Sequence, residues 1–196
     1  AAFIVRNSYR RFPEGSIHLI AVNTEPEPGG QLLAATLHGH FFLCADNGML
    51  GLLGGSEPEK VVSLSREKIA SLSRDTDSGE STFLSLTILA DAACAISRGQ
   101  AIESLGQLTS GYSSQTPLRP AIEGDTISGS VVYIDSYQNA ITNVSAELFK
   151  RVGKGRDFTI YVQSKHYRIQ RIRTRYNEVP PGELLARLIP EAVRIR

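Results

Sequence analysis

Several residue types are scarce in this sequence, and their scarcity narrows the classes of protein that it can encode. Tryptophan is absent from the 196 residues, methionine occurs once and cysteine occurs twice. Cys44 and Cys94 lie far apart in the chain, each within an apolar segment. Two such cysteines are typical neither of a disulfide framework nor of a zinc site, so the sequence predicts two buried free thiols in a cytosolic protein.

Long apolar runs and an excess of charge of one sign are also missing. No stretch approaches the roughly 20 consecutive apolar residues of a membrane-spanning helix, and the first residues do not have the pattern of a signal peptide. The net charge is +1, with 41% hydrophobic and 21% charged residues, which is ordinary for a soluble globular protein. We therefore expect a cytoplasmic protein without membrane partners.

The four histidines do not form an evident metal-binding set. His38 and His40 are predicted to alternate onto one face of a strand, but no cysteine, aspartate or third histidine stands at ligand spacing. The sequence therefore predicts no metal site.

Positive charge is concentrated in residues 146–175, which contain nine lysines and arginines and only two acidic residues, Glu147 and Asp157. Such a stretch suits either a nucleic-acid surface or a solvated outer face. Phe158, Ile160 and Val162 alternate as the inward side of a strand would, and no RNA-binding aromatic signature accompanies the charge. The pattern favours the solvated face over a nucleic-acid partner.

Hydrophobic periodicity divides the chain into two parts. Helices are expected at residues 1–9 and 85–98, a buried strand at 16–22, a hairpin of strands 32–37 and 40–44 around His38-Gly39, and a strand at 58–64. Residues 65–81 are polar and predict a loop or a weak helix, and residues 110–120 have the composition of a linker. Short strands follow, with one brief helix at 145–151 that Ser145 caps. We predict an α/β domain over residues 1–120, with a Rossmann-like central sheet flanked by helices, and a mainly β, barrel-like domain over residues 121–196.

Polar residues follow the strand predicted at residues 16–22. Asn23 and Thr24 come directly after it, ahead of a proline- and glycine-rich loop. The carboxyl ends of core strands are where α/β folds hold their ligands, so this position is a candidate binding site. Asp46, Asn47 and Gly48 form a second polar sequence, which is typical of a structural turn.

The stretch from Gly124 to Val144 carries the densest chemistry. Its apolar residues predict a strand that enters a buried sheet, and a polar turn, Asp135 to Asn139, follows at once. A carboxylate, an aromatic ring and two carboxamides could recognise a small molecule that carries an amine and a heteroaromatic ring. The same residues could also form a turn that satisfies only its own backbone.

One segment and four further motifs, in order along the chain, resemble one family. Residues 134–143, IDSYQNAITN, resemble the I-D-x-F/Y-G-N-x-I/W-T-N segment of the S-adenosylmethionine hydroxide adenosyltransferases, whose superfamily includes a fluorinase and a chlorinase. FPEGSIHLIAVNT at residues 12–24, ADNGML at 45–50 and Thr82-Phe83 precede this segment in the family's order, and VPPGE at 179–183 follows it. The resemblance covers most of the chain.

The resemblance implies a function and a set of binding residues. Family members displace methionine from the ribose 5′-carbon of S-adenosylmethionine, and no further cofactor is implied. The residue matching Asp135 would hold the methionine amino group, Asn139 would bond the adenine edge, and Tyr137 would line the pocket. Members are typically trimers whose sites lie between one subunit's first domain and its neighbour's second, so Asn23 and Thr24 would face that turn from another subunit.

The sequence departs from the hydrolases at the residues that handle water. Asn23 stands where they have aspartate, Leu84 stands where they have histidine, and no arginine follows at the family's position. Neither asparagine nor leucine accepts a proton at neutral pH. Ser85 falls where the fluorinase has its halide-contacting serine, which we interpret as coincidence because its neighbours differ. The catalytic residues are therefore left open.

Two further departures concern the turn and the ends of the chain. Gln138 stands where the family has glycine, and a positive φ there would strain the turn. The family's opening T-D-F-G-like turn and its closing L-x-I-A pattern have no counterpart here. We expect the first domain to lack its N-terminal part in this chain.

Three functional hypotheses remain from the sequence. The first is an S-adenosylmethionine hydrolase that forms adenosine and L-methionine. The second is a non-catalytic protein of the same fold that binds S-adenosylmethionine or adenosine, which the substitutions at Asn23 and Leu84 favour. The third and least favoured is a nucleic-acid-binding protein.

Overall fold

The chain forms two compact units, Ala1–Pro117 and Leu118–Arg196. The computed structural model describes residues 1–25, 30–53, 57–72 and 83–196. The division falls inside the linker predicted at residues 110–120, and the two-domain architecture is confirmed. None of the helices in these ranges combines the length and hydrophobicity that crossing a bilayer requires.

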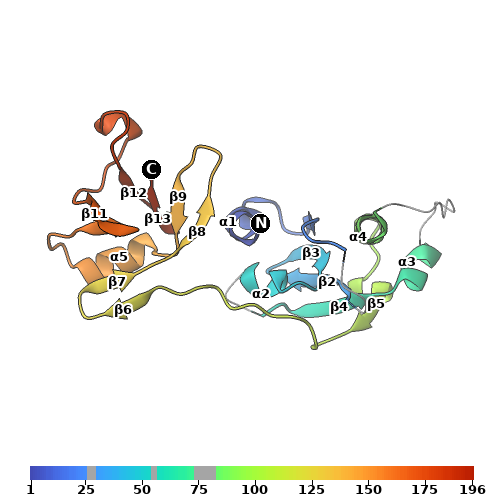
Figure 1. Ribbon diagram of the computed structural model, residues 1–196. Coiled ribbons are helices and arrows are strands. Elements are labelled where there is room, and N and C mark those ends of the chain that lie inside the picture. The colour runs from blue at the N-terminus through green and yellow to red at the C-terminus, as the bar shows by residue number, and fades with distance from the viewer. Residues whose placement is uncertain (26–29, 54–56, 73–82) are drawn as a thin grey trace. The chain divides into compact units, whose positions relative to one another are not determined.

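The first unit is built on a mixed five-stranded sheet (Figure 1). In spatial order its strands are β1 (Ile17–Ile20), β3 (His40–Ala45), β2 (Leu32–Leu37), β4 (Lys60–Leu64) and β5 (Gly106–Leu108). The pair β1–β3 is parallel and the other three pairs are antiparallel. This sheet and the helices on it confirm the predicted α/β first domain.

Helices cover both faces of this sheet because its strands are apolar on both sides. Leu33, Phe42 and Tyr9 belong to the core on one face, and Ala34, Leu43 and Leu89 to the core on the other. The first face carries α1 (Ala2–Ser8), η1 (Tyr9–Arg11) and α2 (Met49–Leu53), and the second carries α3 (Arg66–Leu72), α4 (Leu84–Ser97) and η2 (Ile102–Leu105).

The strand predicted at residues 16–22 is shorter and less buried than its sequence suggests. β1 has four residues and lies at the edge of the sheet, where β3 is its single partner among the described strands. Leu19 is 37% exposed and Val22 is 41% exposed. A continuous apolar run does not distinguish an edge strand from a central one, and the prediction of a fully buried strand is wrong.

The hairpin predicted at residues 32–44 is confirmed, and it corrects the placement of His38. His38 and Gly39 both have positive φ, 50° and 74°, as a two-residue turn with the twist of the strands requires. His38 therefore lies in the turn, with its Nδ1 2.9 Å from Tyr9 Oη, while His40 is buried on β3. The two histidines do not share a strand face.

The predicted thiols are both free but not both buried. Cys44 is buried in β3, and burial, together with the charge of Asp46, raises the pKa of its thiol to about 12. Cys94 is exposed on α4, which corrects the prediction of two buried cysteines. The helix turns this residue away from the core that Ala92 and Ala95 enter.

His18 and His40 form a close pair next to the aromatic core. Their Nε2 and Nδ1 atoms lie 3.2 Å apart, and the His18 ring stacks on Phe42 with ring centroids 5.0 Å apart. Burial, and secondarily the proximity of His40, lowers the pKa of His18. Among the described residues, no group of three or more histidine, cysteine, aspartate or glutamate side chains is placed to hold a metal ion.

We expect His18 to make the protein acid-sensitive. Because its folded pKa lies below its unfolded value of 6.5, its contribution to stability is present above that value and is lost as pH falls through the folded pKa. The thermal midpoint should decline as the pH falls below 6.5, and His18→Gln should flatten the decline. The exposed His166→Gln serves as control. An unchanged slope in the His18 variant would contradict the assignment.

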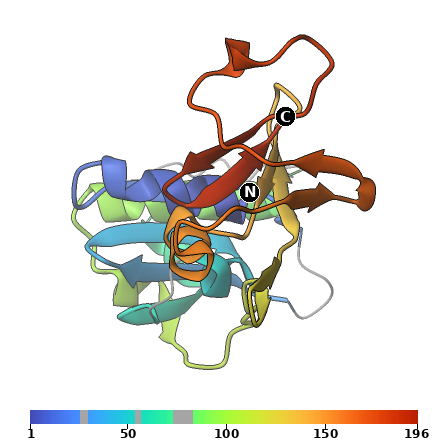
Figure 2. The same cartoon turned by 90° about the vertical axis from the view of Figure 1, so that its left-hand side faces the viewer.

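The second unit contains three small sheets, one α-helix and one short 3-10 helix. A four-stranded sheet has the order β12 (Ala186–Ile189), β13 (Ala192–Ile195), β9 (Ala140–Thr142) and β8 (Val131–Ile134), seen in Figure 2 in red and yellow-orange. The remaining elements are β6 (Ala121–Glu123), β7 (Thr126–Ser128), α5 (Ala146–Gly153), β10 (Ile160–Val162), β11 (Ser164–Ile169) and η3 (Tyr176–Glu178). The mainly β second domain is confirmed.

The prediction that this domain is barrel-like is wrong. Within residues 118–196, all described, β12 and β8 are the outer strands of the four-stranded sheet and do not pair with each other, and the pairs β6–β7 and β10–β11 are separate sheets. Closure would require the first and last strands to pair. The apolar residues of β8 are also exposed, with Val131 at 52% and Ile134 at 58%, so this strand does not enter a buried sheet as predicted.

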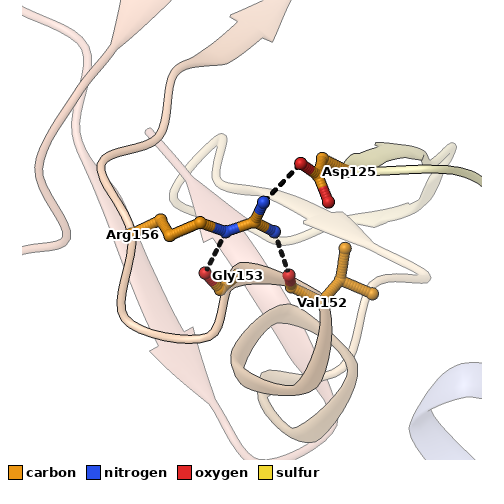
Figure 3. A network of polar contacts seen from close by, with 4 residues as sticks. All are labelled: Asp125, Val152, Gly153 and Arg156. Atoms are coloured by element: carbon orange, nitrogen blue, oxygen red, sulfur yellow. Dashed lines mark hydrogen bonds and ion pairs between the residues drawn. The ribbon is translucent and has the colours of Figure 1, made fainter.

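Helix α5 has a defined cap at each end. Ser145 accepts a hydrogen bond from the Leu148 amide, which confirms the N-cap expected there. At the other end Arg156 donates to the carbonyl oxygens of Gly153 and Val152, at 3.1 and 2.7 Å, and also pairs with Asp125 (Figure 3). This arginine joins the β6–β7 turn to the helix.

Candidate functional site

The carboxyl end of β1 is held by the predicted Asp46–Gly48 turn. Asn47 Nδ2 donates to the carbonyl oxygen of Val22 at 3.0 Å, and Asn47 Oδ1 accepts from the Met49 amide at 3.2 Å. Asn23, just beyond β1, has a φ of 49° and an exposed side chain. The turn has a structural role, and it presents Asn23 and the half-buried Thr24 at the strand end.

A carboxylate that the sequence analysis missed lies next to this strand end. Ser85 Oγ donates a hydrogen bond to Glu25 Oε2 at 3.2 Å. Ser85 is only 6% exposed and lies in the first turn of α4, whereas its neighbour Leu84 is 39% exposed. Thr82 of the family-like motifs and residues 26–29 of the loop after Thr24 lie outside the described residues. The structure thus shows a carboxylate in contact with Ser85, the residue that follows Leu84.

The glutamates that follow the strand predicted at residues 16–22 could have drawn attention to Glu25 in the sequence. The segment NTEPEPGG replaces a family loop that contains aspartate, and its first carboxylate falls two positions after Asn23. Nothing in the sequence pairs that carboxylate with Ser85, which is sixty positions away in the chain. Only the fold of β1 against α4 brings the two together.

The Asp135–Asn139 turn is organised around the carboxylate of Asp135. Its Oδ1 accepts from the backbone amides of Tyr137 and Asn139, both at 2.9 Å, and its Oδ2 accepts from Asn139 Nδ2 at 2.7 Å. The Asn139 side chain, then the backbone amides and the charge of Arg194, lower the pKa of Asp135. The backbone amides of the turn are thus satisfied by its own carboxylate, as the structural alternative in the sequence analysis expected.

The same turn also leaves acceptor capacity that no described residue uses. Asn139 is 2% exposed, and because its amide nitrogen faces a carboxylate, its Oδ1 must point elsewhere. That buried oxygen has no hydrogen-bond partner within the described residues, and Oδ2 of Asp135 retains an unused lone pair. Tyr137 is 74% exposed. One buried acceptor, one anionic acceptor and one open aromatic face therefore lie in five residues.

The predicted site residues fall into two groups. Asp135, Tyr137 and Asn139 share one turn of the second unit. Asn23, Thr24, Leu84 and Ser85 lie in the first unit, where Glu25 joins the strand end to α4.

Gln138 has the strained conformation that the sequence analysis anticipated. Its φ is 65°, a left-handed value that glycine adopts freely and glutamine does not. We expect Gln138→Gly to raise the free energy of unfolding by up to about 1 kcal/mol, measured by urea denaturation. Gln170 does not have a positive φ, so Gln170→Gly should lower it instead. Equal losses in both variants would show that Gln138 is unstrained.

Two domain models of one family match the chain. The model of the SAM (S-adenosylmethionine) hydroxide adenosyltransferase N-terminal domain matches residues 1–106, and that of the C-terminal domain matches residues 129–188. The chain belongs to this family. The membership agrees with the order of the four sequence motifs and points to a function that involves S-adenosylmethionine.

Solved structures with little sequence identity share the fold. A crystal structure of an uncharacterized conserved protein from Thermotoga maritima has a TM-score of 0.81 and 18% identity, and the match covers 99% of this chain and 74% of that protein. A conserved hypothetical protein from Thermus thermophilus has a TM-score of 0.65 and 21% identity, and the match covers 99% of this chain and 71% of that protein. No curated protein matches the sequence significantly.

Proposed function

We propose that this protein is an S-adenosylmethionine hydrolase that forms adenosine and L-methionine. The observation that carries the proposal is the hydrogen bond between Ser85 and Glu25, because it supplies a carboxylate where the family's water-handling residues are replaced. Family membership over both domains supports the choice of substrate.

In the proposed reaction, water attacks the ribose 5′-carbon as the carbon–sulfur bond breaks. The electron pair of that bond goes to sulfur, which leaves as neutral methionine thioether, and the water gives a proton to Glu25. Positive charge on sulfur is neutralised in the transition state, so alignment in a dry pocket contributes more than a strong acid would. Ser85 would orient the carboxylate, and Glu25 would act as general base.

Substrate binding is assigned to the two groups of site residues. Asp135 would accept from the methionine ammonium and the free Oδ1 of Asn139 from the adenine amino group, while Tyr137 would cover the ligand. Asn23 and Thr24 would contact it from the first unit of a neighbouring subunit in a homotrimer. The exposed apolar edge strand β8 supports such association, because an unpaired apolar edge favours contact with another chain.

Product analysis in labelled water tests the proposal. Incubation with S-adenosylmethionine in H₂¹⁸O should release adenosine that carries the label in its 5′-hydroxyl, with equimolar methionine, as measured by chromatography and mass spectrometry. Tight binding without adenosine release over hours would instead support the non-catalytic binding protein, which Asn23 and Leu84 favour. Light scattering that gives a monomer mass with ligand binding intact would contradict the trimer.

A further inference from the structure

Three arginines gather on one face of the second unit's four-stranded sheet. Arg187 on β12 lies directly opposite Arg194 on β13, and Arg196 follows two residues later on the same side. Like charges directly opposite in an antiparallel pair destabilise it. Repulsion within this arginine cluster (Arg187, Arg194 and Arg196) therefore lowers the stability of the folded unit, unless other contacts or a bound ligand offset it.

One aromatic ring organises the arginine cluster. The guanidinium carbons of Arg187 and Arg196 lie 4.7 and 5.2 Å from the centroid of the Tyr176 ring. Arg194 Nη1 donates to Tyr176 Oη at 2.8 Å. Cation–π contacts of this kind hold the guanidinium groups in place but do not neutralise their charge.

No carboxylate forms an ion pair with the arginine cluster within the described residues, whose salt bridges join Lys60 to Glu103 and Arg156 to Asp125. The charge of Arg194 does contribute to lowering the pKa of Asp135, but the two side chains do not form a salt bridge. Glu178 turns its Oε1 back onto the backbone and side chain of its own loop. The Nε atoms of Arg187 and Arg194 are buried without a hydrogen-bond partner, which leaves two donors unused.

We propose that the arginine cluster binds a phosphate group. A phosphate dianion offers several terminal oxygens and up to two negative charges, which suits three guanidinium forks better than a single carboxylate does. It would accept from the two unused Nε–H donors and remove the like-charge cost between Arg187 and Arg194. The proposal goes beyond the hydrolase and does not depend on it.

The surroundings leave room for the rest of a phosphorylated ligand. A pocket of about 930 Å³ adjoins the cluster and is lined by residues 176–185 and Arg196. Five of these eleven residues form the VPPGE loop (residues 179–183), to which the proposed hydrolase reaction assigns no role. The phosphate could therefore be free or belong to a nucleotide monophosphate, and the two sources need separate tests.

Nuclear magnetic resonance of the full-length protein tests the proposal directly. The Nε–H signals of Arg187 and Arg194 should shift saturably with inorganic phosphate at constant ionic strength, and should not shift with chloride. AMP that binds more tightly than phosphate, while adenosine leaves the signals unmoved, would assign the phosphate to a nucleotide. Saturable shifts with methionine but none with phosphate would mark a carboxylate site and overturn the proposal.

Matched variants distinguish phosphate binding by the arginine cluster from a non-specific attraction of phosphate to surface arginines. Arg194→Gln and Arg187→Gln should each weaken phosphate binding by about tenfold or more, because each removes charge-assisted hydrogen bonds. Arg168→Gln, an exposed position on β11, should change it less than about twofold. Unaltered phosphate affinity in both cluster variants would refute the site. The wild-type titration decides the question even if a variant fails to fold.

Discussion

Glu25→Gln is expected to slow adenosine release by about 10²–10⁴-fold, because it removes the proposed general base while keeping the shape of the side chain. Ser85 can still donate to the amide oxygen, so the local structure should persist. Substrate affinity should therefore remain near that of the wild-type protein, and the loss should fall on kcat rather than on KM.

Two companion variants make this result specific. Ser85→Ala leaves the carboxylate in place but removes its hydroxyl partner, so we expect a smaller loss than in Glu25→Gln. Glu14→Gln changes an exposed carboxylate of the same unit and should leave the rate unchanged. A Glu25→Gln protein with wild-type kcat would place the base elsewhere. Rates would be measured under single-turnover conditions, which separate chemistry from product release.

The importance of Glu25 shows where sequence reasoning stops. The sequence was sufficient to locate the two strand ends that carry polar residues and the hairpin at His38 and Gly39, because turns and periodicity are local. The contact between Ser85 and Glu25 depends on how β1 packs beside α4, and the resemblance drew attention to Asn23 and Leu84 instead. A local pattern cannot supply a contact that the tertiary structure creates.

Exposure was the property most often misjudged. The runs that became β1 and β8 are apolar, and an apolar run indicates a strand without showing whether both of its edges are paired. Leu19 and Val131 are exposed because their strands lie at sheet edges. Cys94 is exposed for a related reason, because residue type alone did not show which side of α4 faces the core. In each of these cases the element was placed correctly and its surroundings were not.

The Asp135–Asn139 turn is the part of the candidate site that the sequence described best. The positive φ at Gln138 and the bonds from Asp135 to its own turn were both among the readings that the sequence offered. What the sequence could not show is that Asp135 also fixes the side chain of Asn139, which leaves a buried oxygen of that amide free. The two residues therefore act as one unit, and a variant of the first should also affect the second.

Asp135→Asn should consequently weaken the binding of adenosine as well as that of S-adenosylmethionine. An asparagine has one acceptor oxygen and one donor nitrogen, so it cannot accept from the two backbone amides and from Asn139 Nδ2 at the same time. The Asn139 amide must then turn and lose the orientation proposed to bind adenine. We expect at least about a tenfold loss for both ligands by isothermal titration.

A control and a second ligand decide between two roles of Asp135. Asp125→Asn removes a carboxylate of the same unit that pairs with Arg156, away from the turn, and should leave both affinities unchanged. If Asp135→Asn weakened S-adenosylmethionine alone, the carboxylate would bind the ligand's ammonium directly and Asn139 would be held by other contacts. If it weakened both, and Asn139→Ala weakened both to a similar extent, Asp135 would be the residue that positions Asn139, because truncating the amide and misorienting it remove the same hydrogen bond.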